Sequence, residues 1–437
     1  MSWLDFFQTT QTLKHTFGRG INASISKNEE ELFIKSSQAF EKKDILNAYE
    51  LFFESLINFT DDKANNNITY IRTDEELHFT IYQGCAKIKG KITKENLYAD
   101  AIIVKKENAN VALKRYILER NYQLTYAYYF TNNEHIMLKL YYDNITMSPQ
   151  KIFFPLREIA LNADYDKEHI KSEFVDIELE DVSHIKTLEK NEAQIKFDYL
   201  HKWIKEVEEK VSLLPSNDNA SMQAFLYLNL LFKIDYLLVP KYMISQKLSK
   251  NILEYFAQDS LNIESKNEEL NNFIDKLKGI SFEEFNKNFY NANYTFNPTE
   301  KSSYEDIITF INESLSKIRW YKNNRYNQII PTIYKYIAFY TLYNYGLNPV
   351  LRELLHLLVE VQNPDFFDDL DYKTLYNEET NTFKTKVILT RVDDIITNYL
   401  GRFKALESFS AELNFSSLND FNNSFYQQIQ NLNFEEI

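Results

Sequence analysis

The sequence predicts an α+β protein, in which a small antiparallel sheet with flanking helices near the N-terminus is followed by a large, mostly α-helical domain. Residues 66–143 contain short runs of β-branched and aromatic residues with alternating polarity, and Asn, Asp and Gly separate these runs. On both sides of this region, apolar residues recur every three to four positions, which indicates helices. Since 437 residues exceed what one hydrophobic core usually supports, we expect two or three domains.

The N-terminal residues 1–28 are predicted to form a tail or a short helix. Two helices are expected within 29–59, because apolar residues share one helical face in each half of this stretch. Asp44 lies between the halves and is suited to cap the second helix. The pattern is that of a helical hairpin preceding the sheet.

Alternation and composition predict six strands with one helix, over 108–120, inserted before the last two. The expected strands are 68–72, 77–82, 86–92, 97–104, 124–130 and 135–142. Ser148 and Pro149 would suit a helix start, but Pro155 should interrupt a helix beginning there. We therefore expect the following helix to run from Asp164 to about Phe174.

This order of helix, strands, helix, two strands and helix, over about residues 30–175, resembles the fold of type III secretion chaperones and their relatives. The resemblance rests on element order alone, because that fold has no diagnostic residue motif. It implies helices packed on one face of a twisted sheet, in a domain that commonly dimerises and binds segments of other proteins. Residues 29–176 are accordingly interpreted as a secretion-chaperone-like domain, with a homodimer among its expected assemblies.

Residues 185–437 are predicted to form a helical domain. The acidic stretch 176–184 marks the candidate boundary, although it could also form a short strand. Apolar periodicity indicates helices near 200–214, 220–238, 242–257, 266–278, 303–321, 329–345, 349–361, 386–409 and 418–431.

Composition excludes several classes of function. Only 7 of 437 residues are glycine, and Gly18-Arg19-Gly20 alone begins the pattern that phosphate-binding loops need, so P-loop and Rossmann-type nucleotide folds are not expected. A net charge of −14 argues against an extensive nucleic-acid interface. The single cysteine, Cys85, leaves no partner for an intrachain disulfide and no cysteine-based zinc site.

The sequence also indicates a soluble, cytoplasmic protein without a transmembrane segment. The first residues lack the basic and apolar regions of a secretory signal, and no run of about 18 uncharged apolar residues occurs. Two segments come nearest to such a run. Residues 224–239 are interrupted by Lys233 and Asp235, and residues 329–345 are interrupted by Pro331 and Lys335.

No catalytic or cofactor motif is recognised, and we expect neither a cofactor nor a metal. Glu353 and His356 have the Glu-x-x-His spacing of di-iron bundles, but such a site needs further ligands from other helices. A partly buried, hydrogen-bonded His356 is the preferred interpretation. An enzyme with a dispersed site, first of all on the Glu353–His356 face, remains the alternative function.

Two basic features occur in this acidic chain. Lys87, Lys89 and Lys91 would project from one face of a strand, where we expect them to protect an exposed sheet or its edge from pairing with another chain. An acidic ligand is the alternative for these lysines.

The second feature interleaves cationic and aromatic side chains over residues 319–326, as in anchors for protein partners. The predicted partner-binding residues are Trp320, Tyr321, Arg325 and Tyr326. A polar helix junction with a cation–π pair is the alternative at this place. The sequence therefore predicts a non-enzymatic protein-interaction, adaptor or chaperone-like protein. Peripheral membrane association through the tyrosine-rich segment 326–345 is a further alternative.

Overall fold

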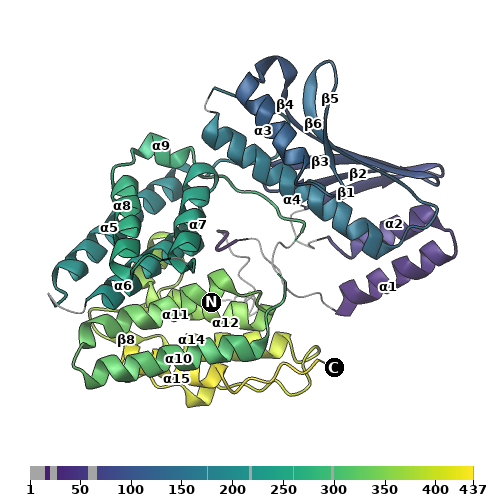
Figure 1. Cartoon of the computed structure of the whole chain (residues 1–437). Coiled ribbons are helices and arrows are strands. Elements are labelled where there is room, and N and C mark those ends of the chain that lie inside the picture. The colour runs from purple at the N-terminus through teal and green to yellow at the C-terminus, as the bar shows by residue number, and fades with distance from the viewer. Residues whose placement is uncertain are drawn as a thin grey trace.

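The computed structural model of the chain describes residues 15–19, 27–57, 66–174, 176–215, 219–258, 260–296 and 300–436. The α+β class is confirmed: an antiparallel sheet with its helices is followed by a large assembly of helices (Figure 1). Buried apolar residues form two main clusters, one beneath the sheet and one inside the helical assembly. Most of the N-terminal stretch 1–28 lies outside the described residues.

The sheet has six strands in the order β1-β2-β3-β4-β6-β5, and every neighbouring pair is antiparallel. One face of the sheet is apolar and buried, as the alternating burial along β2 and β4 shows. On this face the ring of Phe79 lies over Gly90 of the next strand, where a Cβ atom would come within 2.0 Å of the ring. The strands are β1 (Ile68–Arg72), β2 (Glu76–Gln83), β3 (Ala86–Thr93), β4 (Asn96–Lys105), β5 (Tyr128–Thr131) and β6 (His135–Asp143).

Four helices accompany the sheet, and the longest of them crosses its apolar face, in contact with β2, β3, β4 and β6 (Figure 1). They are α1 (Lys27–Glu41), α2 (Ile45–Glu54), α3 (Val111–Asn121) and α4 (Pro149–Glu173).

Helix α4 corrects the prediction that Pro155 interrupts a helix starting at Pro149. The helix runs without a break for 25 residues from an N-cap at Ser148, whose side chain accepts the Lys151 N–H. An internal proline costs about 3 kcal/mol. Complete burial of Ile152, Leu156 and Ile159 in the sheet's core offsets this cost.

The predicted strand over 124–130 is also corrected, because only Tyr128–Thr131 pairs with β6. The backbone N–H groups of the three residues before this strand donate instead to a single carboxylate of α4. Glu158 accepts hydrogen bonds from the backbone N–H groups of Thr125 at 2.9 Å, Tyr126 at 2.6 Å and Ala127 at 2.7 Å. A side chain from a distant helix thus replaces the strand pairing that the sequence indicated.

In the helical part, α6 packs more extensively on α11 than on any other helix. The α-helices are α5 (Lys190–Ser212), α6 (Ala220–Lys233), α7 (Tyr242–Phe256), α8 (Ile263–Lys278), α9 (Phe282–Asn286), α10 (Tyr304–Asn323), α11 (Ile330–Asn344), α12 (Pro349–Gln362), α13 (Pro364–Asp369), α14 (Thr385–Asn398) and α15 (Leu418–Ile429). A π-helical turn, η4 (Ile234–Leu238), continues α6 and ends at Val239, which has a φ of 56°.

The helix predicted over 386–409 ends early, at Asn398. The chain then turns and meets the C-terminal residues, where Phe403 forms an isolated β-bridge with Glu436 and the Lys404 N–H donates to the Glu435 carbonyl at 3.1 Å. Phe403 is buried by this arrangement. The apolar residues after 398 therefore fill the core from an irregular segment.

The segment after α9 ties the helical part to the sheet. At the turn between β2 and β3, the Gly84 N–H donates to the Asn293 carbonyl at 2.8 Å, and the Gln83 side chain accepts the Thr295 N–H at 3.0 Å. Phe296 packs within the sheet's own core. The sheet is therefore anchored to a segment more than two hundred residues away along the chain.

Residues 15–19 form a non-helical segment that lies against the helical core. The Gly18 N–H donates to the Tyr236 carbonyl at 2.7 Å, and the Phe17 ring packs on His356 and Phe367 with centroids 5.2 Å apart in both cases. Gly18 has a φ of 67°, and a Cβ there would approach the Tyr236 ring to 2.8 Å, so a side chain at this position would be strained as well as crowded.

Candidate functional site

The four predicted partner-binding residues lie at the C-terminal end of α10 and differ in exposure. Trp320 is 55% exposed and Arg325 is exposed, whereas Tyr326 is half-buried and Tyr321 is buried in the helical core. Arg325 adopts a left-handed conformation with a φ of 64°, after which the Tyr326 N–H donates back to the Tyr321 carbonyl at 2.9 Å. This helix end folds the Tyr326 ring toward Trp320, with centroids 6.3 Å apart and ring planes 20° from parallel.

Trp320 and Tyr321 border an aromatic groove of about 350 Å³ between α6, α7, α10 and α11. The rings that line this groove are Phe225, Tyr255, Phe256, Trp320, Tyr321 and Tyr336. Phe256 and Trp320 are exposed at its mouth, while Tyr336 is buried. The groove is thus an apolar depression with two large side chains already in contact with solvent.

Four cationic residues lie in the last two turns of α10 or just after it: Lys317, Arg319, Lys322 and Arg325. All four are exposed, and Lys317 lines the aromatic groove. Within the described part of the chain, none of them has a carboxylate within 4.0 Å or stacks on an aromatic ring. The cation–π pair considered from the sequence is therefore not found among these residues, and their charge faces solvent.

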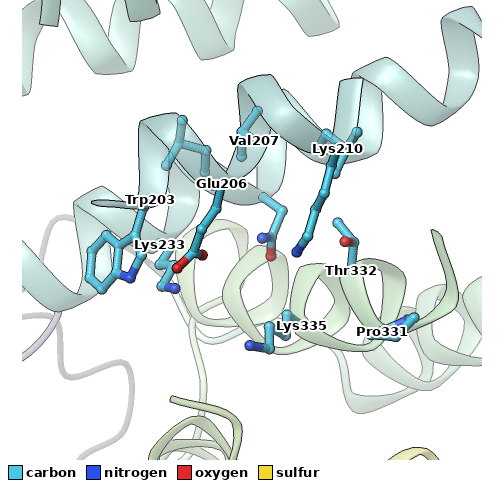
Figure 2. Close-up of a pocket in the computed structure, with 11 residues that line it drawn as sticks. Trp203, Glu206, Val207, Lys210, Lys233, Pro331, Thr332 and Lys335 are labelled. Carbon is cyan, nitrogen blue, oxygen red and sulfur yellow. The ribbon is translucent and has the colours of Figure 1, made fainter. Parts of the chain in front are cut away.

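A second depression, the lysine pocket, lies on the other side of the α6–α11 pair and has a volume of about 70 Å³ (Figure 2). Glu206 and Lys210 extend from α5 toward the two helices that carry Lys233 and Lys335 (Figure 2). Trp203, Asn229 and Thr332 also line it. Three cationic side chains from three helices therefore converge on a small space.

Lys233 is the most buried cation of this pocket, with 7% of its surface exposed. Its Nζ lies 3.9 Å from the centroid of the Trp203 ring. Burial and, next, the charge of Lys335 lower the pKa of Lys233 well below the ordinary value for lysine. Burial also lowers the pKa of Lys335. Neither ammonium group has a carboxylate within 4.0 Å or a hydrogen bond to the residues that the structure describes.

The helical period of α6 explains how one helix serves both depressions. Phe225 and Leu228 line the aromatic groove, whereas Asn229 and Lys233 line the lysine pocket. At 100° per residue, the first pair points on average about 90° away from the second pair around the helix axis, so adjacent faces of α6 line the two sites. The seam between α6 and α11 separates the two sites.

Sequence reasoning missed the lysine pocket, although a signal for it was present. Lys233 and Lys335 are the lysines that interrupt the two longest apolar runs. From the sequence alone, these interruptions argue against membrane spans. A charge inside an otherwise apolar helix also indicates a buried polar site, but the convergence of α5, α6 and α11 requires the fold.

Glu353 and His356 do not face a common point. Glu353 accepts a hydrogen bond from the Tyr399 hydroxyl at 2.6 Å, while the buried His356 meets the Tyr236 hydroxyl through Nδ1 at 2.9 Å. Glu360 lies 3.3 Å from His356 Nε2, and burial lowers the pKa of His356. Over the described ranges, no group of three or more His, Cys, Asp or Glu side chains is placed to hold a metal ion.

The lysines of β3 are paired internally. Asp181 lies 3.5 Å from the Lys87 ammonium and 2.9 Å from that of Lys89, and Glu76 pairs with Lys91. The strand itself lies between β2 and β4, so these lysines do not protect a sheet edge, whereas Lys89 and Lys91 do lie on an exposed part of the sheet.

The tyrosine-rich segment 326–345 corresponds largely to α11, whose residues Tyr334 and Tyr336 belong to the buried core. Its rings are thus turned into the helical assembly rather than toward a membrane surface. Among the described residues, no helix combines the length and apolar character that crossing a membrane requires.

Comparison with known proteins adds no relative to this picture: the chain matches no protein-family model and shows no significant sequence similarity to any curated protein.

Proposed function

We propose that this is a non-enzymatic protein-interaction protein whose aromatic groove receives an acidic, apolar segment of a partner protein. The observation that supports this proposal is the exposed Trp320 beside an apolar groove, next to four cations that pair with no carboxylate of the described ranges. Neither feature is needed to complete the core. Together they match the apolar centre and charged rim of protein interfaces.

The size and chemistry of the aromatic groove specify the kind of partner. A volume of about 350 Å³ is at the lower end of the roughly 300–1,000 Å³ typical of ligand pockets, which suits one or two large apolar side chains. Tryptophan and tyrosine are the residues that most often dominate binding energy at interfaces. Lys317 at the groove and Arg319, Lys322 and Arg325 nearby would attract and orient acidic residues of the same partner segment.

A photo-crosslinking amino acid at position 317, on the rim of the groove, tests this proposal in the native host. We expect it to capture a defined segment of a partner, rich in Asp or Glu and carrying large apolar residues. The same crosslinker at position 154 is the control, because Phe154 of α4 is 52% exposed and does not line the groove. Equal capture from both positions would contradict the proposal, as would crosslinks mainly to a second copy of this chain.

Trp320→Ala supplies the energetic test of the same site. Loss of an interface tryptophan commonly costs about 2 kcal/mol or more, so we expect at least about a tenfold loss of partner affinity. Phe154→Ala removes an aromatic side chain of similar exposure and should leave the affinity unchanged. An unaltered affinity of the Trp320→Ala protein for the crosslinked partner would exclude the groove as the binding site.

A further inference from the structure

Two charged residues interrupt the apolar sequence at the end of α6, and the fold treats them differently. Asp235 is buried and is paired with Arg19, whose Nη2 lies 2.8 Å from Oδ1. Lys233 is equally buried, but its ammonium group has neither a carboxylate nor a hydrogen-bond acceptor among the described residues. Glu206 of the same pocket favours the charged form of Lys233 but lies beyond 4.0 Å, so Lys233 lacks the direct ion pair that the fold provides for Asp235.

A cation with little access to water and no direct ion pair is costly, because burial removes part of its hydration. Here the cost is increased by Lys335 and Lys210, which line the same pocket. Three lysines and one glutamate thus line this small pocket, which leaves it with an excess of positive charge that suits a bound anion.

We propose that the lysine pocket binds the carboxylate of a small organic acid, with Lys233 and Lys335 as its cationic partners. The volume of about 70 Å³ is several times the roughly 10–15 Å³ that a single water needs, so the pocket has room for the three non-hydrogen atoms of a carboxylate. The Thr332 hydroxyl at the pocket supplies a further donor. Glu206 lines the same pocket and limits its net positive charge, which favours an anion of single charge.

Binding of such an anion is coupled to protonation of Lys233. The charged groups that act on Lys233 are Lys335 of α11 and Lys202, Glu206 and Lys210 of α5. Of these, only Glu206 favours the protonated form. A bound carboxylate adds a second negative charge, so the protein takes up protons on binding and its affinity rises as the pH falls toward neutrality. Above pH 6 a carboxylic acid stays ionised, so this dependence comes from the protein.

Lysine ¹³Cε chemical shifts, followed by NMR over pH 6 to 11, test the coupling with acetate as the probe. The Lys233 signal is assigned by its loss in Lys233→Met, with Lys335→Met as a second variant. We expect acetate to raise the pKa of Lys233 relative to chloride at the same ionic strength, and both variants to bind acetate about tenfold more weakly or worse. The signal of Lys205, an exposed lysine of α5 outside the pocket, should be the same in both salts.

Two outcomes would overturn the proposal. The first is a Lys233 titration that is identical in acetate and chloride, which would mean that the pocket holds no carboxylate. The second is a larger rise in inorganic phosphate than in acetate at matched concentration, which would reassign the site to a phosphate. Because the readout is a titration of one lysine, it is independent of any partner protein at the aromatic groove.

Discussion

At the scale of single residues, some buried charged side chains stabilise this fold and others destabilise it, depending on whether they have an ion-pair partner. Asp235 is paired with Arg19, and Glu360 accepts two hydrogen bonds from Arg391 at 2.5 and 2.6 Å. Lys233 has no such partner among the residues that the structure describes. Removing one member of a buried pair typically costs about 3–5 kcal/mol, whereas replacing an unpaired buried charge by an apolar side chain should stabilise the protein.

Lys233→Met should therefore raise the free energy of unfolding at pH 7, by about 1–3 kcal/mol. Methionine fills similar space and can contact the Trp203 ring through its sulfur. The pKa of Lys233 is lower in the folded protein than the ordinary value of 10.5 that applies to the unfolded chain. Between these two pKa values the unfolded chain binds more protons than the folded protein. The unsubstituted protein therefore loses stability as the pH falls through this range. The gain from Lys233→Met should accordingly be smaller at pH 10 than at pH 7.

Urea unfolding followed by circular dichroism at both pH values measures this difference. Lys205→Met, at an exposed position of α5, serves as the control and should change stability by less than about 0.5 kcal/mol. If Lys233→Met proves destabilising at both pH values, the Lys233 ammonium has a compensating interaction, and the account of an unpaired charge is wrong.

At the scale of elements, local patterns predicted the sheet well where the strands pair regularly. The expected strands 68–72, 86–92 and 97–104 coincide within two residues with β1, β3 and β4. The errors occur where a distant element overrides the local pattern. Burial of one face of α4 carries that helix through Pro155, and the Glu158 carboxylate of the same helix holds residues 125–127 out of the sheet. Neither interaction can be read from neighbouring residues.

Glu158→Ala should loosen the chain between α3 and β5. The change removes three charge-assisted hydrogen bonds and leaves three backbone N–H groups without their acceptor, which we expect to cost about 2–3 kcal/mol. Because β5 is at the edge of the sheet, the effect should be concentrated in residues 125–131. Hydrogen exchange of this segment should become faster.

Exchange measured by mass spectrometry on Glu158→Ala and Glu119→Ala checks this prediction. Glu119 is an exposed carboxylate of α3, and its removal should leave exchange over 125–131 unchanged. Unaltered exchange in both proteins would show that the loop is held by its own packing rather than by Glu158.

At the scale of the whole molecule, the two candidate sites differ in how far the sequence could predict them. Trp320, Tyr321 and Tyr326 follow one another closely, so a local motif was enough to identify them as a group. The lysine pocket combines α5, α6 and α11, and more than a hundred residues separate Lys210 from Lys335. Packing of α6 on both α5 and α11 brings these lysines together, which is why the sequence showed the individual charges but not their convergence.

Contacts between the C-terminal end of α6 and residues 15–19 also join segments that are distant in the sequence. Arg19 donates from Nε and Nη2 to Asp235 at 2.8–3.2 Å, donates to Ser249 at 3.0 Å and lies 4.3 Å from the centroid of the Tyr343 ring. With Gly18 bound to the Tyr236 carbonyl, the segment 15–19 satisfies polar groups of the π-helical turn that follows Lys233. We infer that this segment is part of the stable structure of the helical assembly.

A double-mutant cycle on Arg19 and Asp235 tests that inference. Arg19→Met leaves the buried Asp235 carboxylate without its partner and should lower the free energy of unfolding by about 2–4 kcal/mol, since Arg19 is itself partly exposed. Asp235→Asn in the Arg19→Met background removes the unpaired charge and should recover most of this loss. We therefore expect a coupling energy of about 1–3 kcal/mol from urea unfolding of the four proteins. Additive effects of the two substitutions would show that the segment 15–19 contributes little to stability through this pair, and that Asp235 is accommodated by water or by backbone groups instead.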